Sequence, residues 1–386
     1  MEGIERGRSA VQYMQGWDQY IGLRSLVAAP ARLNNEKAIP RKSRRSMGRM
    51  SVFAVQAAEE ALADAGLAME SVPSGRMGCI IGSTMGGAES LNEAFETMLP
   101  RKDLSQLPAM KFFQCVSHTA AMNVAQYLGI TGYVMATSAA CASSLQAIGT
   151  GYDLIRMGKQ DVVLCGGSEE LHPTVTASFD ILFATSCGYN GDPQRTPRPF
   201  DRERDGLVCG EGCGIVALEE YERALSRKAH IYGEIIGYHT AGSGDHVSQS
   251  SSDAIMVCLR EALASAGIAS HDVDYINAHG TATVQGDRAE AEAIRKVFGD
   301  TVPVSSLKGY IGHTLGASGA LELIVSLATM QRGTIFPTRN LERVADDCQG
   351  ICHVTRPLAG DVKIILKNCF AFGGINAVLV CQRLPL

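Results

Sequence analysis

Cys141 lies among small side chains, in the segment ATSAACASSLQ at positions 136–146. The small residues ahead of it permit a tight turn, and the amphipathic run after it predicts a helix that begins at the cysteine. At a helix N-terminus, unpaired amides and the helix dipole favour the thiolate, lower the pKa of the thiol and can stabilise an oxyanion. These features are typical of a nucleophile that attacks a thioester. Taken alone, a cysteine among alanines and serines is more often a buried packing residue.

Two histidines of the second half lie in glycine-containing segments. His279 follows an apolar strand pattern and begins the sequence HGT, where its ring can project into a cleft. His313 shares a glycine-rich loop with Lys308, and Glu322 follows on the next helix. A lysine, an imidazole and a carboxylate together suggest a network that fixes the tautomer and charge of the ring. Separately, a structural histidine, a solvated lysine and a helix-surface glutamate are the commoner interpretations.

The segment NCFAFGGIN, at positions 368–376, follows a buried strand pattern and contains two phenylalanines and two consecutive glycines. It predicts an apolar, bendable loop. Such a loop can close a pocket or supply an amide to an oxyanion hole. The alternative is that the two phenylalanines only fill space by packing.

Apolar runs that end in glycine alternate with alanine-rich amphipathic stretches, which predicts βαβ units around a buried sheet. Expected strands are residues 78–82, 162–166, 231–238, 273–277, 302–306 and 363–366. Expected helices are residues 51–65, 142–157, 254–266, 287–297 and 318–331.

The two halves of the chain repeat one plan. EALADAGL at 60–67 and EALASAGI at 261–268 each end a helix and lead to a strand with a glycine turn. Stacking two such halves sheet to sheet brings both helix starts to one central cleft. The second half begins with a strand, whereas the first fifty residues are charged and irregular. We therefore expect the first half to lack its first strand, through truncation or a misassigned start.

Composition limits the class of protein. The 386 residues are 46% hydrophobic and carry a net charge of −5, which predicts a globular protein and gives no argument for nucleic acid or membrane binding. There is no bilayer-length apolar run and no signal-peptide core. The twelve cysteines form no CxxC pair and lack the neighbours of a zinc site. We expect reduced thiols, no metal and a cytoplasmic location.

Together, these segments resemble the β-ketoacyl-acyl carrier protein synthases of the elongating class, from about Pro40 to Leu386. The family pattern joins a cysteine among small residues, HGT with an acidic residue eight positions on, K-x4-H with GAxG, and N-x-F-x-F-G-G. This chain carries them all in that order, with GGSE at 166–169 and RPFDRERDG at 198–206. Thiolases use a second cysteine, and initiating synthases pair the cysteine with histidine and asparagine. Cys141 distinguishes the chain from chain-length-factor subunits.

The resemblance implies an α/β, thiolase-like fold of two pseudo-symmetric halves, residues 1–220 and 221–386, in stacked α-β-α-β-α layers. It assigns catalysis to Cys141, His279, His313, Lys308, Glu322 and Phe372, and substrate binding to Thr281, Thr283, Met85, Phe370, Gly373 and Gly374. The cysteine would accept an acyl chain, and the two imidazoles would bind a malonyl thioester and stabilise its enolate after decarboxylation. The amides of Cys141 and Phe372 would form the oxyanion hole, Phe372 and the 245–252 loop would gate the pocket, and Met85 would limit its depth.

The same resemblance implies a homodimer that needs no cofactor. It also implies that the partner protein is acyl carrier protein. A basic strip is expected to dock it, formed by Arg41, Lys42, Arg44, Arg45 and Arg49. A solvated charged face is the alternative. Ala371 and Ile375 depart from the family's usual glycine and threonine. With FATS at 183–186, the motif FAFGGIN is similar to synthases of aryl polyene pigment clusters.

Two other functions are weighed against an active condensing enzyme of fatty acid, polyketide or aryl polyene synthesis. One is a subunit of a heteromeric synthase, paired with a chain-length-factor-like protein and tuning chain length. The other is a thiolase-fold acyltransferase that uses coenzyme A directly. Condensation by the purified chain alone, and sensitivity to charge reversal at Arg44 and Arg45, would distinguish them.

Overall fold

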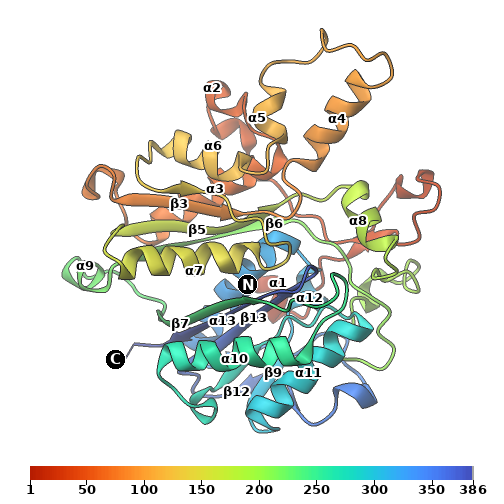
Figure 1. The fold of residues 1–386 in the computed structure, drawn as a ribbon, viewed down its shortest axis with the longest axis vertical. Helices are drawn as coiled ribbons and strands as arrows, with labels where there is room; N and C mark the ends of the chain where they lie inside the picture. The colour runs from red at the N-terminus through yellow and green to blue at the C-terminus, as the bar shows by residue number, and fades with distance from the viewer. Residues whose placement is uncertain (385–386) are drawn as a thin grey trace.

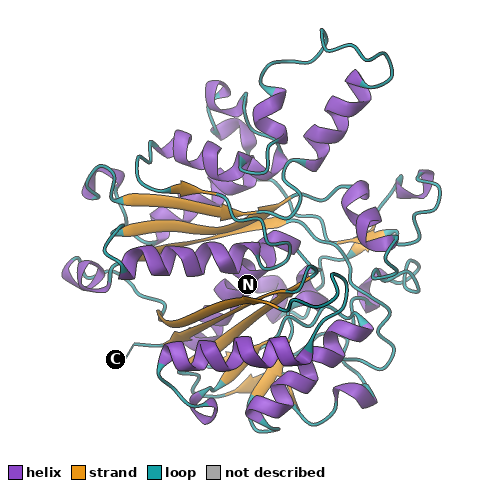
Figure 2. Ribbon diagram, in the orientation of Figure 1, coloured by secondary structure: helices purple, strands orange, loops and turns teal. Residues whose placement is uncertain are grey.

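The computed structural model describes residues 1–384. Two β-sheets lie one above the other, with helices outside each sheet and a helical layer between them (Figures 1 and 2). The five alternating layers are the α-β-α-β-α layers that the family resemblance implies, and the two stacked sheets are those that the repeat predicts.

The first sheet contains four strands in the order β4-β3-β5-β6. They are β3 (Met77–Gly82), β4 (Val134–Met135), β5 (Val162–Glu169) and β6 (Gly212–Glu219). β3 is parallel to β4 and β5, and β6 runs antiparallel to β5. Every residue of β3 and β5 is buried, because helices cover both faces of the sheet, and this explains their continuous apolar sequence.

The second sheet contains six strands in the order β11-β9-β8-β13-β14-β7. They are β7 (Glu234–Gly242), β8 (Tyr275–Asn277), β9 (Pro303–Ser305), β11 (Cys352–His353), β13 (Ile364–Ala371) and β14 (Ile375–Gln382). The strand β13 is parallel to β8 and antiparallel to β14, and β14 pairs along its length with β7.

The strand that the first half was expected to lack is indeed missing among residues 1–384. The order β4-β3-β5-β6 matches β9-β8-β13-β14, but nothing pairs with β6 as β7 pairs with β14. The first residues form only short elements, α1 (Glu2–Glu5), β1 (Gln12–Tyr13) and β2 (Val27–Ala28). Ile4 packs against Leu307 and Tyr310 of the second half.

The middle layer consists of α7 (Ser143–Arg156) and α13 (Ser318–Arg332), which contact strands of both sheets (Figure 1). Outside the first sheet lie α3 (Arg49–Asp64) and α6 (Thr119–Leu128), and outside the second lie α10 (Ser252–Ala266) and α11 (Val284–Phe298). All five predicted helices are present, and their ends differ from prediction by three residues or fewer. The two repeat motifs end α3 and α10, which occupy equivalent outer positions.

Short elements complete the chain. They are α2 (Arg41–Arg44), α4 (Ala88–Met98), α5 (Lys111–Cys115), α8 (Pro173–Asp180), α9 (Tyr221–Ser226), α12 (Lys308–Ile311), β10 (Thr334–Ile335) and β12 (Leu358–Ala359). Short 3-10 turns link several of them. Across the described residues, no helix combines the length and apolarity that crossing a membrane requires.

Gly149 lets α7 approach the second sheet closely. A Cβ atom at this position would lie 2.2 Å from the ring of Tyr238 in β7. We expect Gly149→Ala to destabilise the protein by about 1–3 kcal/mol, because overpacking forces the ring or the helix to shift. Chemical denaturation measures this. Gly3→Ala, where the added methyl meets nothing within 4 Å, is the matched control. Equal stability of the two variants would contradict the close packing.

Candidate active site

Cys141, His279 and His313 meet between the two halves. The sulfur of Cys141 and one nitrogen of each ring all lie within 4.8 Å of one another. Nε2 of His313 is 3.0 Å from Sγ of Cys141. The two imidazoles stand nearly perpendicular, with ring centroids 5.2 Å apart. Residues separated by 172 positions therefore share one reaction centre, at the convergence that the two-half repeat predicts.

The backbone places Cys141 on a tight turn between β4 and α7. Ala140 adopts a φ of 47°, a conformation that L residues adopt only under local constraint. The Ser143 hydroxyl donates to the carbonyl of Ala140 at 2.6 Å and accepts from the amide of Ala139 at 2.8 Å. The helix begins at Ser143, two residues later than the sequence suggested. Cys141 thus lies just ahead of the helix.

A buried carboxylate fixes the loop of His279. Glu290 of α11 accepts the amides of His279 and Gly280, each at 2.7 Å, and the side-chain amide of Asn368 at 3.0 Å. Burial raises the pKa of Glu290, although these donors oppose the shift. Glu290 therefore orients the histidine through its backbone.

A second buried carboxylate joins the turn after His313 to the first half. Glu169, at the end of β5, accepts the amide of Gly316 at 2.9 Å and the amide of Thr84 at 2.7 Å. Burial raises the pKa of Glu169 as well. The amide of His313 itself donates to the carbonyl of Val208 at 2.7 Å. The relative position of the halves is thus fixed next to the reaction centre.

Two buried lysines share one buried carboxylate behind the imidazoles. Lys308 donates to Oε1 of Glu322 at 2.7 Å, and Lys367 donates to Oε2 at 2.5 Å. Burial lowers the pKa of both His279 and His313 well below the usual range, and the two ammonium groups lower it further. Both rings are therefore neutral at physiological pH, with one N–H each to donate.

The pKa of Cys141 contradicts the sequence-based expectation. We expected the helix N-terminus to lower it, but burial raises it above that of a free cysteine, and Lys308 opposes the shift only in part. The resting site therefore holds a thiol beside a neutral imidazole, and the thiol must lose its proton as it attacks. The nearby Nε2 of His313 is placed to accept it. Although a thiol and two imidazoles could ligate a metal, the two ammonium groups disfavour a cation here.

A pocket of about 280 Å³ opens above the reaction centre. Its lining includes Cys141, His279, Thr281, Thr283, His313, Phe370 and Phe372. The hydroxyls of the two threonines lie 2.9 Å apart. Met85 is not part of this lining, and it is 42% exposed. Its depth-limiting role stays a prediction.

The expected loop at 368–376 is shorter than predicted. The strand β13 continues to Ala371, because each residue from Ile364 onward pairs with β14. Only Phe372, Gly373 and Gly374 form the turn, and the two glycines adopt φ values of 86° and 72°. The amide of Gly373 donates to the carbonyl of Val247 at 2.7 Å, so the turn contacts the 245–252 loop.

Comparisons with known proteins agree with this geometry. The model of the N-terminal domain of β-ketoacyl synthases matches residues 2–224, and that of the C-terminal domain matches residues 232–342. The chain belongs to the β-ketoacyl synthase family.

Full-length relatives support this assignment. The chain is 35% identical to 3-oxoacyl-[acyl-carrier-protein] synthase 1 of Escherichia coli K12, over 100% of this chain and 94% of that protein. A crystal structure of a β-ketoacyl synthase from Burkholderia phymatum STM815 is similar, with a TM-score of 0.95 and 42% identity over 100% of this chain and 94% of that one. A type II PKS acyl-carrier protein complex with its ketosynthase, bound to the hexaketide, aligns with a TM-score of 0.91 and 30% identity over the same shares.

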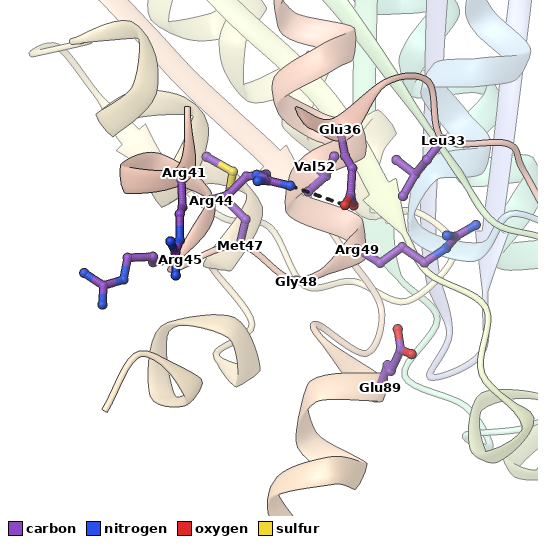
Figure 3. A pocket seen from close by; sticks show the side chains of 10 residues that line it. All are labelled: Leu33, Glu36, Arg41, Arg44, Arg45, Met47, Gly48, Arg49, Val52 and Glu89. Atoms are coloured by element: carbon purple, nitrogen blue, oxygen red, sulfur yellow. Dashed lines mark hydrogen bonds and ion pairs between the residues drawn. The ribbon is translucent and has the colours of Figure 1, made fainter. Parts of the chain in front are cut away.

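In this β-ketoacyl synthase, the four arginines of the basic strip line one surface hollow of about 440 Å³, together with Glu36 and Glu89 (Figure 3). Arg41, Lys42 and Arg45 are exposed and form no ion pair with any described residue. Arg44 pairs with Glu36 at 3.3 Å. Arg49 instead binds Glu211 through two hydrogen bonds of 2.9 and 2.6 Å, which gives it an internal partner.

The sequence analysis did not identify Lys367, Glu290 or Glu169 as site residues. Lys367 interrupts the apolar run of β13, and a lysine inside a fully buried strand is a signal that sequence alone could have provided. The two glutamates carry no comparable signal, because they act on backbone amides whose positions depend on tertiary packing and not on a sequence pattern.

Proposed function

We propose that this chain joins a malonyl unit to an acyl chain by decarboxylative condensation between carrier-bound thioesters, with Cys141 as nucleophile. The observation that carries the proposal is the meeting of one thiol and two neutral imidazoles at the floor of a partly apolar pocket. A covalent intermediate divides the reaction into two steps.

In the first step, Cys141 attacks the acyl thioester of a carrier. The new carbon–sulfur bond forms as the carrier's thiol leaves, and the proton moves from Cys141 through Nε2 of His313 to that leaving thiolate. The amides of Cys141 and Phe372 stabilise the oxyanion. The product is an acyl chain on Cys141.

In the second step, a malonyl thioester enters the emptied side of the pocket. The N–H of His279 and the N–H of His313, whose neutral ring now carries its proton on Nε2 instead of Nδ1, hydrogen-bond its carbonyl oxygen and stabilise the enolate that forms as carbon dioxide leaves. The enolate carbon attacks the acyl group, the bond to the Cys141 sulfur breaks, and the released thiolate takes up a proton from solvent. The product is a β-ketoacyl thioester on the carrier.

Intact-protein mass spectrometry tests the first step. Incubation with an acyl-carrier thioester should add one acyl group, and peptide mapping should place it on Cys141. Condensation by the purified chain alone would then argue against a tuning subunit. No adduct with carrier-bound acyl chains, together with labelling by acyl-coenzyme A, would favour the coenzyme A-dependent alternative.

We infer that Arg41, Lys42, Arg44 and Arg45 dock the acidic carrier, and that Arg49 contributes mainly through its internal pair. Arg41 and Arg45 provide positive charge without a partner, at the rim of a hollow large enough for polar side chains. The complex of a carrier with a ketosynthase among the similar structures supports a carrier as the partner.

Reversing two of the three unpaired charges, Arg41→Glu with Arg45→Glu, should raise KM for the malonyl carrier about tenfold or more and leave kcat nearly unchanged, because rim charges act mainly on association. The difference should shrink as salt is added. Steady-state kinetics at two salt concentrations measures it. Arg260→Glu with Arg356→Glu, at two exposed positions elsewhere, changes the net charge equally and is the control. If the control raised KM by the same factor, the net charge of the protein and not a docking surface would explain the result.

We also propose that the two halves of the chain are separate domains, with the boundary at residue 220. A second copy of the chain would pair with the outer edge of the first sheet. There β4 has a free edge, and Tyr133 and Val134 are each nearly half exposed, as expected for a strand that pairs with another chain. Light scattering of the purified chain tests the homodimer. A monomer that dimerises only with a second, cysteine-free subunit would favour the heteromeric alternative.

A further inference from the structure

Lys367 is a fully buried lysine in the centre of the second sheet. It lies on β13, four residues before the end of that strand at Ala371. Its ammonium donates to Oε2 of Glu322 at 2.5 Å and to the carbonyl of Asn368 at 2.6 Å. Burial alone would lower the pKa of Lys367, but the Glu322 carboxylate raises it, so the group is charged.

The charge of Lys367 is not needed to neutralise Glu322. Lys308 already pairs with the other carboxylate oxygen at 2.7 Å, so the three side chains carry one net positive charge. Burial of a charge is costly unless another charge compensates it. Lys367 is therefore more than the counter-charge of Glu322, and the buried carboxylate of Glu290 is a further negative charge that acts on it.

The polar groups around Lys367 lead towards the imidazoles. Asn277 of β8 is the register partner of Lys367, so both side chains lie on one face of the sheet. Its Nδ2 donates to the hydroxyl of Tyr275, whereas its Oδ1 is buried without a partner. His279 follows two residues later. The ammonium thus belongs to a polar layer that ends at the reaction centre.

We propose that Lys367 is a positioning residue for the condensation, whose ammonium acts with that of Lys308 to keep His279 and His313 as neutral hydrogen-bond donors and to favour the enolate. This inference rests on the proposed function and deepens it. No proton leaves Lys367 during the reaction. It acts through a fixed charge that is already in place when negative charge develops on the thioester oxygen.

The direction of the pH effect follows from the charges around the two rings. The elements around the two rings carry further buried titratable side chains besides Lys367, which include Cys141, Glu169, Cys209, Tyr275, Asp287, Glu290, Lys308, Tyr310, Glu322 and Cys369. After burial, Lys308 and Lys367 lower the pKa of both histidines. Removal of one cation raises the pKa of the rings, so they become protonated at a higher pH and activity is lost earlier on acidification.

Lys367→Met, which keeps the length of the side chain but not its charge, tests this. We expect the acid limb of log kcat/KM against pH to move upward by about one unit, because the Lys367 ammonium is one of the charges that lower the pKa of both rings. Lys367→Gln, which is neutral but can still donate to the Asn368 carbonyl, should shift the limb in the same direction. The exposed Lys363, changed to Met, should leave the profile unchanged.

Chemical rescue gives a second readout that a purely structural role would not produce. Lys367→Ala leaves a hole the size of the lost side chain beside Glu322. Ammonium, methylammonium or potassium ions should restore its activity with saturation, while the Met variant, whose side chain fills the space, should not respond. Folding of each variant is checked by its unfolding curve.

The outcomes separate the inference from the function it rests on. A wild-type chain that forms no β-ketoacyl product would overturn the proposed function itself. If the wild type condenses but the folded Met and Gln variants keep its acid limb, or cations restore nothing in the Ala variant, the role of Lys367 is refuted.

Discussion

Cys141→Ala should reduce condensation by about four orders of magnitude or more, because loss of a covalent nucleophile removes the route and not merely one contact within it. The methyl side chain fits the buried site, so the loss should occur in a folded protein. His279, His313 and both lysines remain in place. Quantification of the β-ketoacyl product, with the mass of the intact protein recorded in parallel, measures the loss and shows whether an acyl group is still attached.

The remaining thiols provide the control for this experiment. Cys187 is exposed and unpaired, and Cys187→Ala should retain full condensation and full acylation. If Cys141→Ala still accepted an acyl group at another cysteine, such as the buried Cys369, the nucleophile would have been assigned to the wrong thiol. An acyl adduct that forms only on Cys141 excludes this.

Local periodicity and the internal repeat predicted most of the fold. Fully buried strands such as β3 and β5 appear as continuous apolar runs, and helices such as α7 and α13 carry the amphipathic pattern of a packed layer. The repeat also showed which strand the first half lacks. The same symmetry predicted that two helix starts meet in one cleft, where Cys141 and His313 lie 3.0 Å apart.

The parts of the site that sequence did not reveal depend on long-range packing. The expectation for the pKa of Cys141 had the wrong sign, because a local pattern shows the nearby helix but not the burial that outweighs it. The role of Glu290 depends on amides eleven and ten residues earlier, in a loop whose path the second sheet determines. The pairing of Lys367 with Glu322 joins positions 45 residues apart. None of these contacts produces a periodic pattern in the sequence.

Glu322 should prove the most costly buried side chain to neutralise. It is the carboxylate shared by Lys308 and Lys367, and all three side chains are fully buried. Glu322→Gln keeps the shape but leaves two ammonium groups without a counter-charge. Removing one partner of a buried ion pair costs about 3–5 kcal/mol, so we expect a loss of that size in the free energy of unfolding. Chemical denaturation at neutral pH measures it. Glu292→Gln, which breaks only a surface pair with Lys296, should cost about 1 kcal/mol or less.

A double variant shows whether the cost comes from charge or from lost hydrogen bonds. Adding Lys367→Met to Glu322→Gln removes one of the two uncompensated cations, so part of the stability should return even though another hydrogen-bonding group has been lost. If lost hydrogen bonds dominated, the double variant would be less stable than Glu322→Gln alone. Because the three groups are in direct contact, the changes in the free energy of unfolding should not add. The difference between the double variant and the sum of the single variants therefore decides between charge and lost hydrogen bonds. Recovered stability without recovered condensation would mean that the buried cation pair, costly as it is to the fold, serves the chemistry of the imidazoles.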